Sequence, residues 1–377
     1  MPLTDSSRAA RGVVVNYDCP GSRCASEHER ITQRRFGERL AALKGYEAAG
    51  EYQPSAQYPG PVYFVPSSTL TAGEAATLGI RGPDDLFGGV VPHAFVATKA
   101  ITHPLVEPDA ATLPGWNPAF HDEVRDCVLA GYSTFDHGDA LRAGNRLLAR
   151  GPLRIKPVRA TGGRGQSVAQ NASELERELK SVDRQELVSH GLVLEENLSD
   201  PRTFSVGQLT VGGLTASYFG FQSLTRNNQG EEVYGGSDLT VTRGDFASLL
   251  ALGLEPEIRS AVEQARQYDA AVRSCFAGFF ASRNNYDVLV GRAADGRPRS
   301  GVLEQSWRVG GATGPELAAL EAFRSEPSRG WVQARGIEVF GESPEPPPEA
   351  VVYFRGDDPE VGRLTKYTLL QPHVDAR

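Results

Sequence analysis

One segment of the sequence constrains the fold more than any other: a strand-like run that ends in lysine and proline and enters a glycine-rich loop. The run covers residues 155–157, and the loop carries three glycines between residues 162 and 165. Backbone N–H groups of such a loop can fold over a polyphosphate, while the ammonium of Lys156 meets it as a point charge. The glycine spacing differs from that of a P-loop or a dinucleotide-binding turn. The segment predicts a phosphate-binding hairpin, with a flexible hairpin tip as the alternative.

A second segment is an apolar strand that ends in two acids. Residues 192–194, Leu-Val-Leu, lead directly into Glu195 and Glu196. The main-chain N–H and C=O groups of an extended segment can bind a purine, with a carboxylate accepting a hydrogen bond from its exocyclic amine. Strands that end in two glutamates usually just reach solvent. This segment therefore indicates nucleotide binding only in combination with the glycine-rich loop.

A third segment carries two carboxylates on neighbouring strands. Asp287 and Glu304 each lie in a short apolar run, and Asp295-Gly296 lies between the two runs. If the runs pair as antiparallel strands, both carboxylates project from the same face. Two close carboxylates in an interior site repel each other unless a cation lies between them, and Mg²⁺ prefers carboxylate oxygens combined with phosphates. The alternative, two exposed acids at strand ends, is disfavoured by the apolar neighbours.

In this order and at these distances, the three segments resemble the ATP-grasp superfamily. The resemblance covers residues 99–325, and the region before it resembles the small α/β domain that precedes ATP-grasp folds. More narrowly, residues 97–105, 234–238 and 300–311 are similar to an uncharacterised bacterial family of unknown function within that superfamily. The resemblance implies the α+β class, with a small parallel α/β N-terminal domain followed by two α+β subdomains that clamp the nucleotide.

The resemblance also implies roles for individual residues. Lys99 and Lys156 match the two phosphate-contacting lysines, and Arg308 matches an arginine near the acyl phosphate, which makes Lys156 and Arg308 the implied catalytic residues. The implied ATP-binding set further contains the lid residues Gly162, Gly163, Arg164 and Gly165 and the adenine-binding residues Glu195, Glu196, Asn197 and Leu198. The implied metal ligands are Asp287, Glu304 and Ser306. Ser306 replaces the usual asparagine, which implies weaker magnesium coordination or coordination completed by water.

The activity implied by the resemblance is that of an ATP- and Mg²⁺-dependent carboxylate–amine ligase that forms an acyl phosphate. Its partners would be a small-molecule carboxylate and an amine acceptor. We expect the acceptor between the N-terminal domain, especially residues 18–28, and the C-terminal sheet. One alternative is an ATP-grasp kinase that transfers phosphate without an amine. Another is a nucleotide-binding or partner-binding protein that has lost catalysis, which Ser306 favours.

Composition excludes several other classes of protein. A chain of 377 residues exceeds the size at which one hydrophobic core stops growing, so we expect more than one unit around a shared site. The formal net charge of −8, with no basic run, argues against nucleic-acid binding. No apolar stretch is long enough to span a membrane, and the N-terminus lacks a secretion signal, so a cytoplasmic location is expected. The scattered cysteines and histidines predict no zinc site, and a homodimer remains open.

The apolar patterns divide the chain into four regions. We expect an N-terminal α/β domain over residues 1–98 and a central and lid subdomain over residues 99–190. A C-terminal subdomain would cover residues 191–342, with an antiparallel sheet over residues 203–243. A proline-rich linker and tail with one strand would cover residues 343–377. Within the first region, Glu27 to Ala49 shows near-helical spacing and is predicted as one helix.

Overall fold

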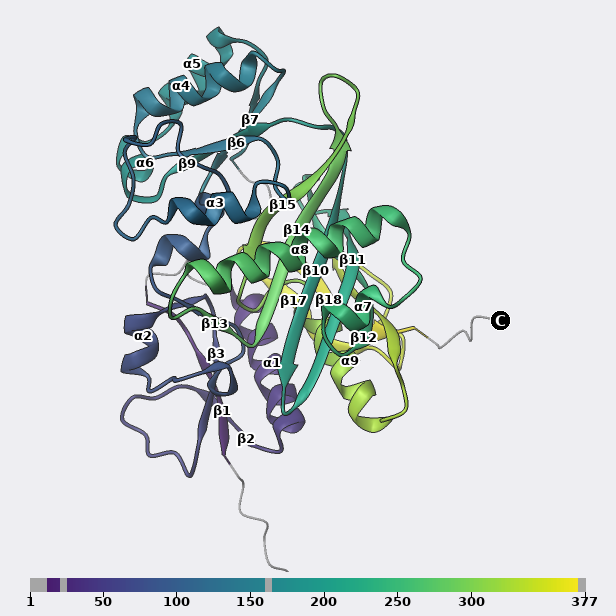
Figure 1. Cartoon of the computed structure of the whole chain (residues 1–377). Coiled ribbons are helices and arrows are strands. Elements are labelled where there is room, and N and C mark those ends of the chain that lie inside the picture. Colours follow the sequence, from purple (N-terminus) through teal and green to yellow (C-terminus); the bar gives the residue numbers. More distant parts are fainter. Residues whose placement is uncertain (1–11, 21–25, 160–164, 372–377) are drawn as a thin grey trace, which may run out of the picture.

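The computed structural model describes residues 12–20, 26–159 and 165–371. Over these residues the chain forms an N-terminal unit, a central unit and a large C-terminal sheet, arranged around the middle of the molecule in Figure 1. The predicted α+β class with a small parallel N-terminal sheet is confirmed. None of the described helices combines the length and the apolar character that crossing a membrane requires.

The N-terminal unit is a parallel sheet with one long helix. Strand β1 (Val13–Tyr17) lies between β2 (Glu47–Glu51) and β3 (Val62–Pro66), and both pairings are parallel. Helix α1 (Glu27–Lys44) connects β1 to β2 and begins with a capping box at Ser26. It ends because Gly45 adopts φ 67°, a left-handed conformation that stops a helix. The prediction of a helix as far as Ala49 is therefore wrong, because parallel pairing with β1 makes the last of these residues a strand.

Short elements lead from the N-terminal unit toward the central unit. They are β4 (Leu70–Thr71), α2 (Ala72–Thr77), η1 (Pro83–Asp85), β5 (Gly89–Val91), η2 (Ala94–Ala97) and η3 (Lys99–Thr102). Strand β5 pairs with β4 and also with β13 (Phe280–Ala281), which comes from much later in the chain. This small sheet therefore ties the N-terminal unit to the start of the C-terminal hairpin.

The central unit is a sheet covered by helices on one face. Its strands, in spatial order, are β6 (Gly131–Thr134), β9 (Leu192–Glu196), β7 (Leu153–Pro157) and β8 (Ser167–Ala169). Helix α3 (Pro118–Val124) precedes the unit, which contains α4 (His137–Leu148), α5 (Ala172–Ser181) and α6 (Arg184–His190). Leu192 and Leu194 belong to the apolar cluster formed with α4 and α5. Because side chains alternate along a strand, Val193 and Glu195 lie on the opposite face.

The C-terminal sheet contains eight strands within the described residues, and its neighbouring strands pair antiparallel. Their spatial order is β15 (Pro298–Ser306), β14 (Arg283–Arg292), β10 (Ser199–Val211), β11 (Leu214–Arg226), β12 (Glu232–Arg243), β16 (Trp331–Phe340), β18 (Gly362–Leu370) and β17 (Val351–Asp358). The residues predicted as a tail thus contribute two strands at one end of the sheet, where the sequence predicted one.

Helices cover both faces of this sheet. One face packs on α7 (Phe246–Leu250) and α8 (Pro256–Cys275) through an apolar cluster that includes Phe204 and Val288. The other packs on α1 and on α9 (Thr313–Ser325) through a cluster that includes Tyr218 and Leu239. Polar side chains on this second face form much of the candidate site.

Candidate functional site

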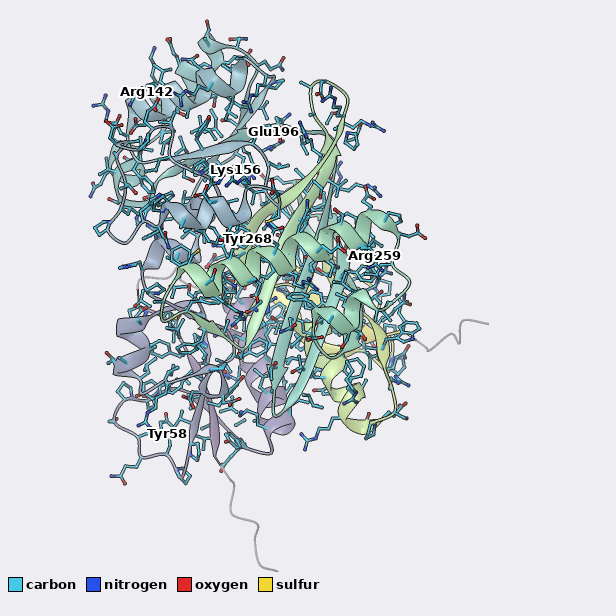
Figure 2. All side chains as sticks on the ribbon, in the orientation of Figure 1. Tyr58, Arg142, Lys156, Glu196, Arg259 and Tyr268 are labelled. Atoms are coloured by element: carbon cyan, nitrogen blue, oxygen red, sulfur yellow. The ribbon has the colours of Figure 1, made fainter. Side chains whose placement is uncertain are left out.

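Lys156 and Glu195 form a buried ion pair on neighbouring strands of the central sheet. The Lys156 ammonium contacts one carboxylate oxygen of Glu195, and His103 Nε2 lies 3.2 Å from the other. Burial alone would raise the pKa of Glu195, but Lys156 and His103 outweigh burial and lower it to about 2. Glu195 is therefore ionised at neutral pH and holds Lys156 in place. Figure 2 places Lys156 in the central unit, on the side toward the C-terminal sheet.

Lys99 approaches the C-terminal hairpin directly. Its ammonium lies 2.8 Å from Oε2 of Glu304, and the side chain of Lys99 is only 5% exposed. Gln305 holds the segment before Lys99 against β15, because its Nε2 donates to the carbonyl oxygens of Val96 (2.9 Å) and Thr98 (2.8 Å). The segment that carries Lys99 is thus bound to β15 at Glu304 and at the adjacent Gln305.

Asp287 and Glu304 lie directly opposite each other in the β14–β15 pairing. Oδ1 of Asp287 accepts hydrogen bonds from Ser205 (3.2 Å) and Gln222 (3.0 Å), which belong to β10 and β11. Burial and the nearby Glu304 raise the pKa of Asp287 to about 6, against the opposing effect of these hydrogen bonds. The ionised form of Asp287 is therefore disfavoured in the metal-free protein, while Glu304 has Lys99 as its counter-charge.

Among the described residues, no group of three or more histidine, cysteine, aspartate or glutamate side chains is arranged to hold a metal ion. The two carboxylates nevertheless fit Mg²⁺, which commonly takes one or two protein carboxylates and completes its shell with phosphates and water. Ser306 is in register with Asn285, two pairs along the hairpin from Asp287 and Glu304. Its hydroxyl lies 3.5 Å from Nη1 of Arg283, which also donates to the Ser306 carbonyl at 3.2 Å.

A buried ion pair supports the end of β15. Arg283 and Glu316 are 1% and 0% exposed, and their closest atoms are 2.8 Å apart. Nη1 of Arg283 donates to the carbonyl oxygen of Arg308 at 2.6 Å. Tyr218 donates to Glu316 at 2.5 Å and accepts from Asn285 at 3.0 Å. The network therefore ties β11, β14, the end of β15 and the start of α9 together.

Arg308 lies at the end of this supported segment. Its Nη1 donates to the carbonyl oxygen of Val309 at 3.0 Å. Burial and the neighbouring Arg283 lower the pKa of Arg308, while Glu304 and Asp287 act in the opposite direction. The arginine therefore belongs to the same electrostatic environment as the acidic pair.

The residues predicted to bind adenine continue β9 into β10. Glu196 accepts a hydrogen bond from the backbone N–H of Ala130 at 3.1 Å, and Oδ1 of Asn197 accepts from Arg154 at 2.8 Å. Leu198 is buried. The side chain of Glu196 points away from the Lys156 face, because adjacent residues of a strand project to opposite sides. Of this segment, the Glu195 side chain reaches Lys156.

The predicted lid falls largely outside the described residues. Gly162, Gly163 and Arg164 are not described, and neither are residues 21–25 of the loop expected near the acceptor. Gly165 is described, with φ 65°, a backbone conformation that glycine adopts at no steric cost. The lid role of this loop stays a prediction.

Sequence reasoning missed several residues of the site. Ser205 and Gln222 hold Asp287, His103 holds Glu195, and the Arg283–Glu316 pair supports Arg308. The predicted antiparallel sheet over residues 203–243 contained a signal for Ser205 and Gln222, because neighbouring strands share faces. No comparable local signal marks Arg283 or Glu316, since they meet only through the packing of α9 against the sheet.

The raised pKa of Asp287 predicts a pH dependence of the metal-free protein. The native state holds this proton more tightly than the unfolded state, whose carboxyl has the ordinary pKa of 3.8. The contribution of Asp287 to the free energy of unfolding is therefore complete below pH 3.8 and declines as pH rises through about 6. In urea unfolding without metal, Asp287→Asn should gain stability relative to the wild type between pH 5 and pH 7.5. If the free energies of unfolding of Asp287→Asn and the wild type differed by the same amount at pH 5 and at pH 7.5, the assignment would be contradicted.

The chain is similar to a known protein family and to several solved structures. A family model described as "Protein of unknown function (DUF3182)" matches residues 16–368. A search of curated protein sequences gives no match.

Solved structures match nearly the whole chain. The N5-carboxyaminoimidazole synthetase of Staphylococcus aureus, complexed with ADP, has a TM-score of 0.54 at 10% identity, covering 97% of this chain and 94% of its own. The biotin carboxylase domain of the 2-oxoglutarate carboxylase of Hydrogenobacter thermophilus, in complex with MgADP and bicarbonate, has a TM-score of 0.54 at 13% identity, covering 96% and 87%. Biotin carboxylase of Campylobacter jejuni, in a β-γ-ATP complex, has a TM-score of 0.53 at 10% identity, covering 95% and 87%. These similarities show the fold, which is that of the ATP-grasp enzymes.

Proposed function

Because the chain belongs to the family described as "Protein of unknown function (DUF3182)" and has the ATP-grasp fold, we propose that it is an ATP- and Mg²⁺-dependent carboxylate–amine ligase. The observation that carries the proposal is the contact of 2.8 Å between Lys99 and Glu304, next to Asp287. It brings a lysine suited to phosphate and two acids suited to Mg²⁺ together from distant parts of the chain.

In this proposal the chain supplies positioning and charge. Lys156 and Lys99 bind the phosphates of ATP, and each exchanges its carboxylate partner for phosphate oxygens. Asp287 and Glu304 hold Mg²⁺, which neutralises phosphate charge when bound. Arg308, fixed through the Arg283 network, stabilises negative charge on the phosphoryl group as it transfers to the carboxylate substrate. The main chain of residues 195–198 binds the adenine, and residues 162–165 cover the phosphates.

The remaining substrates are a small-molecule carboxylate and an amine acceptor. The amine would attack the acyl phosphate that ATP forms on the carboxylate, releasing phosphate. Measuring ADP release with and without added amines distinguishes a ligase from a kinase, because a kinase needs no amine. The alternative of an inactive nucleotide-binding protein predicts ATP binding with no ADP release for any carboxylate.

Nucleotide binding is tested by removing the lysine charge in a way that preserves the fold. Lys156→Met alone would leave Glu195 buried beside only His103, so Lys156→Met/Glu195→Gln removes both charges with similar side-chain volumes. We expect MgATP to bind this double variant at least about 10-fold more weakly in calorimetry, since a charge-assisted hydrogen bond contributes about 1.5–3 kcal/mol. Lys180→Met, at an exposed lysine of α5, is the matched control and should bind like the wild type. Wild-type affinity in a folded double variant would refute the assignment of Lys156.

A further inference from the structure

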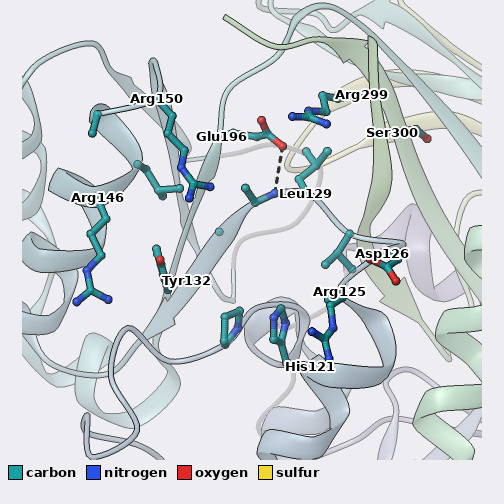
Figure 3. A pocket seen from close by; sticks show the side chains of 16 residues that line it. His121, Arg125, Asp126, Leu129, Tyr132, Arg146, Arg150, Glu196, Arg299 and Ser300 are labelled. Atoms are coloured by element: carbon teal, nitrogen blue, oxygen red, sulfur yellow. Dashed lines mark hydrogen bonds between the residues drawn. The ribbon is translucent and has the colours of Figure 1, made fainter. Parts of the chain in front are cut away.

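A cavity lies on the other side of β9 from Lys156. Its volume is about 760 Å³, within the range of small-molecule sites. It opens between the helix side of the central unit, the end of α3 and the first residues of β15 (Figure 3). Glu196 lines this cavity, whereas its neighbour Glu195 contacts Lys156. The cavity is therefore separate from the proposed nucleotide site, although β9 contributes to both.

Positive side chains surround the cavity. Within the described part of the chain its lining contains four arginines and two acids, a formal excess of two positive charges in a protein whose net charge is −8. The arginines are Arg125, Arg146, Arg150 and Arg299, and they come from three separate parts of the fold. Figure 3 shows Arg150 and Arg299 entering from opposite sides of the cavity. This arrangement concentrates positive potential where the chain as a whole is acidic.

The arginines are available to a ligand. In the described ranges, neither Arg150 nor Arg299 has a carboxylate within ion-pair distance. Arg146 pairs with Glu107, and Arg125 pairs with Asp122 at 3.2 Å, but all four of these side chains are at least 40% exposed. Exposed pairs of this kind contribute only about 0–1 kcal/mol. A multiply charged anion that enters the cavity can therefore replace these partners.

The two acids of the lining, Asp126 and Glu196, are outnumbered by the four arginines. Glu196 already accepts a hydrogen bond from the backbone N–H of Ala130 at 3.1 Å, which holds its carboxylate against the cavity wall. His121 adds a polar group, since its buried Nδ1 has no hydrogen-bond partner among the described residues. Burial and His103 lower the pKa of His121, so at neutral pH its ring is uncharged and can donate one hydrogen bond.

We propose that this cavity binds a small organic phosphate that carries a second acidic group, with Arg150 and Arg299 contacting the two ends. Arginine suits this task because its planar guanidinium binds phosphate and carboxylate oxygens in pairs. Val128, Leu129 and Leu147 form an apolar part of the wall that would pack against the carbon skeleton. Since Arg150 belongs to the central unit and Arg299 to the C-terminal sheet, the ligand bridges two units. The binding does not depend on the proposed ligase activity.

The test uses 3-phosphoglycerate as the probe and the full-length protein. In calorimetry we expect one molecule to bind each wild-type chain, and we expect Arg150→Gln/Arg299→Gln to weaken binding at least about 10-fold, as the loss of two charge-assisted contacts requires. The matched control is Arg142→Gln/Arg297→Gln, which removes the same charge from α4 and from the β14–β15 hairpin outside the cavity. This control and Lys156→Met/Glu195→Gln should bind like the wild type.

Three results would overturn the proposal. One is the absence of one-to-one binding by the wild type at millimolar probe. Another is an equal loss of affinity in the Arg142→Gln/Arg297→Gln control, which would indicate a general electrostatic effect. The third is loss of binding in Lys156→Met/Glu195→Gln, which would place the probe in the nucleotide site.

Discussion

Replacing Glu316 by glutamine is expected to lower the free energy of unfolding by about 3–5 kcal/mol, because it leaves the guanidinium of Arg283 buried without a counter-charge. Arg283 donates three hydrogen bonds of 2.8–3.1 Å to the two oxygens of Glu316. Burial alone would lower the pKa of Arg283, and Glu316 and Tyr218 raise it in the wild type. In the variant the guanidinium stays charged without this partner, because arginine is not deprotonated in proteins. The glutamine has the same shape, and the loss therefore reports the missing charge. Urea unfolding at pH 7 measures it.

A matched surface substitution separates this effect from the general loss of a carboxylate. Glu345 pairs with Arg355 at 2.8 Å but is 85% exposed. Glu345→Gln should change stability by less than about 1 kcal/mol. Arg283→Met/Glu316→Leu, which removes both charges, should recover much of the loss, since apolar side chains of similar volume often replace a buried pair. If Glu316→Gln were no more destabilising than Glu345→Gln, the buried pair would not support the site.

Asp287→Asn should abolish ADP formation, with a fall in kcat of about 100-fold or more, because phosphoryl transfer would lose a charge that holds Mg²⁺. The amide oxygen of asparagine can still accept the hydrogen bonds that Ser205 and Gln222 donate to Oδ1 of Asp287. The variant also removes the repulsion from Glu304 that raises the pKa of Asp287. Its metal-free stability at pH 7.5 should therefore equal or exceed that of the wild type.

Glu304→Gln should also abolish ADP formation, but with a different effect on stability. Glu304 is the partner of the buried Lys99 ammonium at 2.8 Å. Removing its charge leaves that ammonium with a weaker partner, so the metal-free protein should lose stability. The two variants together distinguish metal binding from structural support, since they share the loss of activity and differ in stability. A loss of stability in both with ADP formation unchanged would indicate a purely structural role.

Much of the candidate site could be predicted because its parts are local. The strand before the glycine-rich loop, the strand ending in Glu195 and the hairpin with Asp287 and Glu304 are each marked by a short apolar run beside charged residues. The pairing places Asp287 opposite Glu304. This register includes an irregularity between Asp287 and Val288, which pairs with Val302, and alternation alone does not predict it.

The features of the fold and the site that the sequence did not predict depend on contacts between distant segments. Glu316 lies in the first turn of α9, where an acidic residue favours a helix N-terminus and is usually exposed, yet it is fully buried against the sheet. The prolines of residues 344–348 suggested a linker, but the strands after them pair at the sheet edge through β16 and β18. The cavity at Arg150 and Arg299 likewise arises only where two units meet.

The most direct test of the central claim is the shift in melting temperature that MgATP produces in the wild type and in Asp287→Asn. Bound nucleotide and metal stabilise only the native state, so the wild type should melt at a higher temperature with MgATP than without it. Asp287→Asn should start from an equal or higher melting temperature and lose most of the shift, while the Lys180→Met control keeps it. A full MgATP-dependent shift in Asp287→Asn, or no shift in the wild type at millimolar MgATP, would contradict the account.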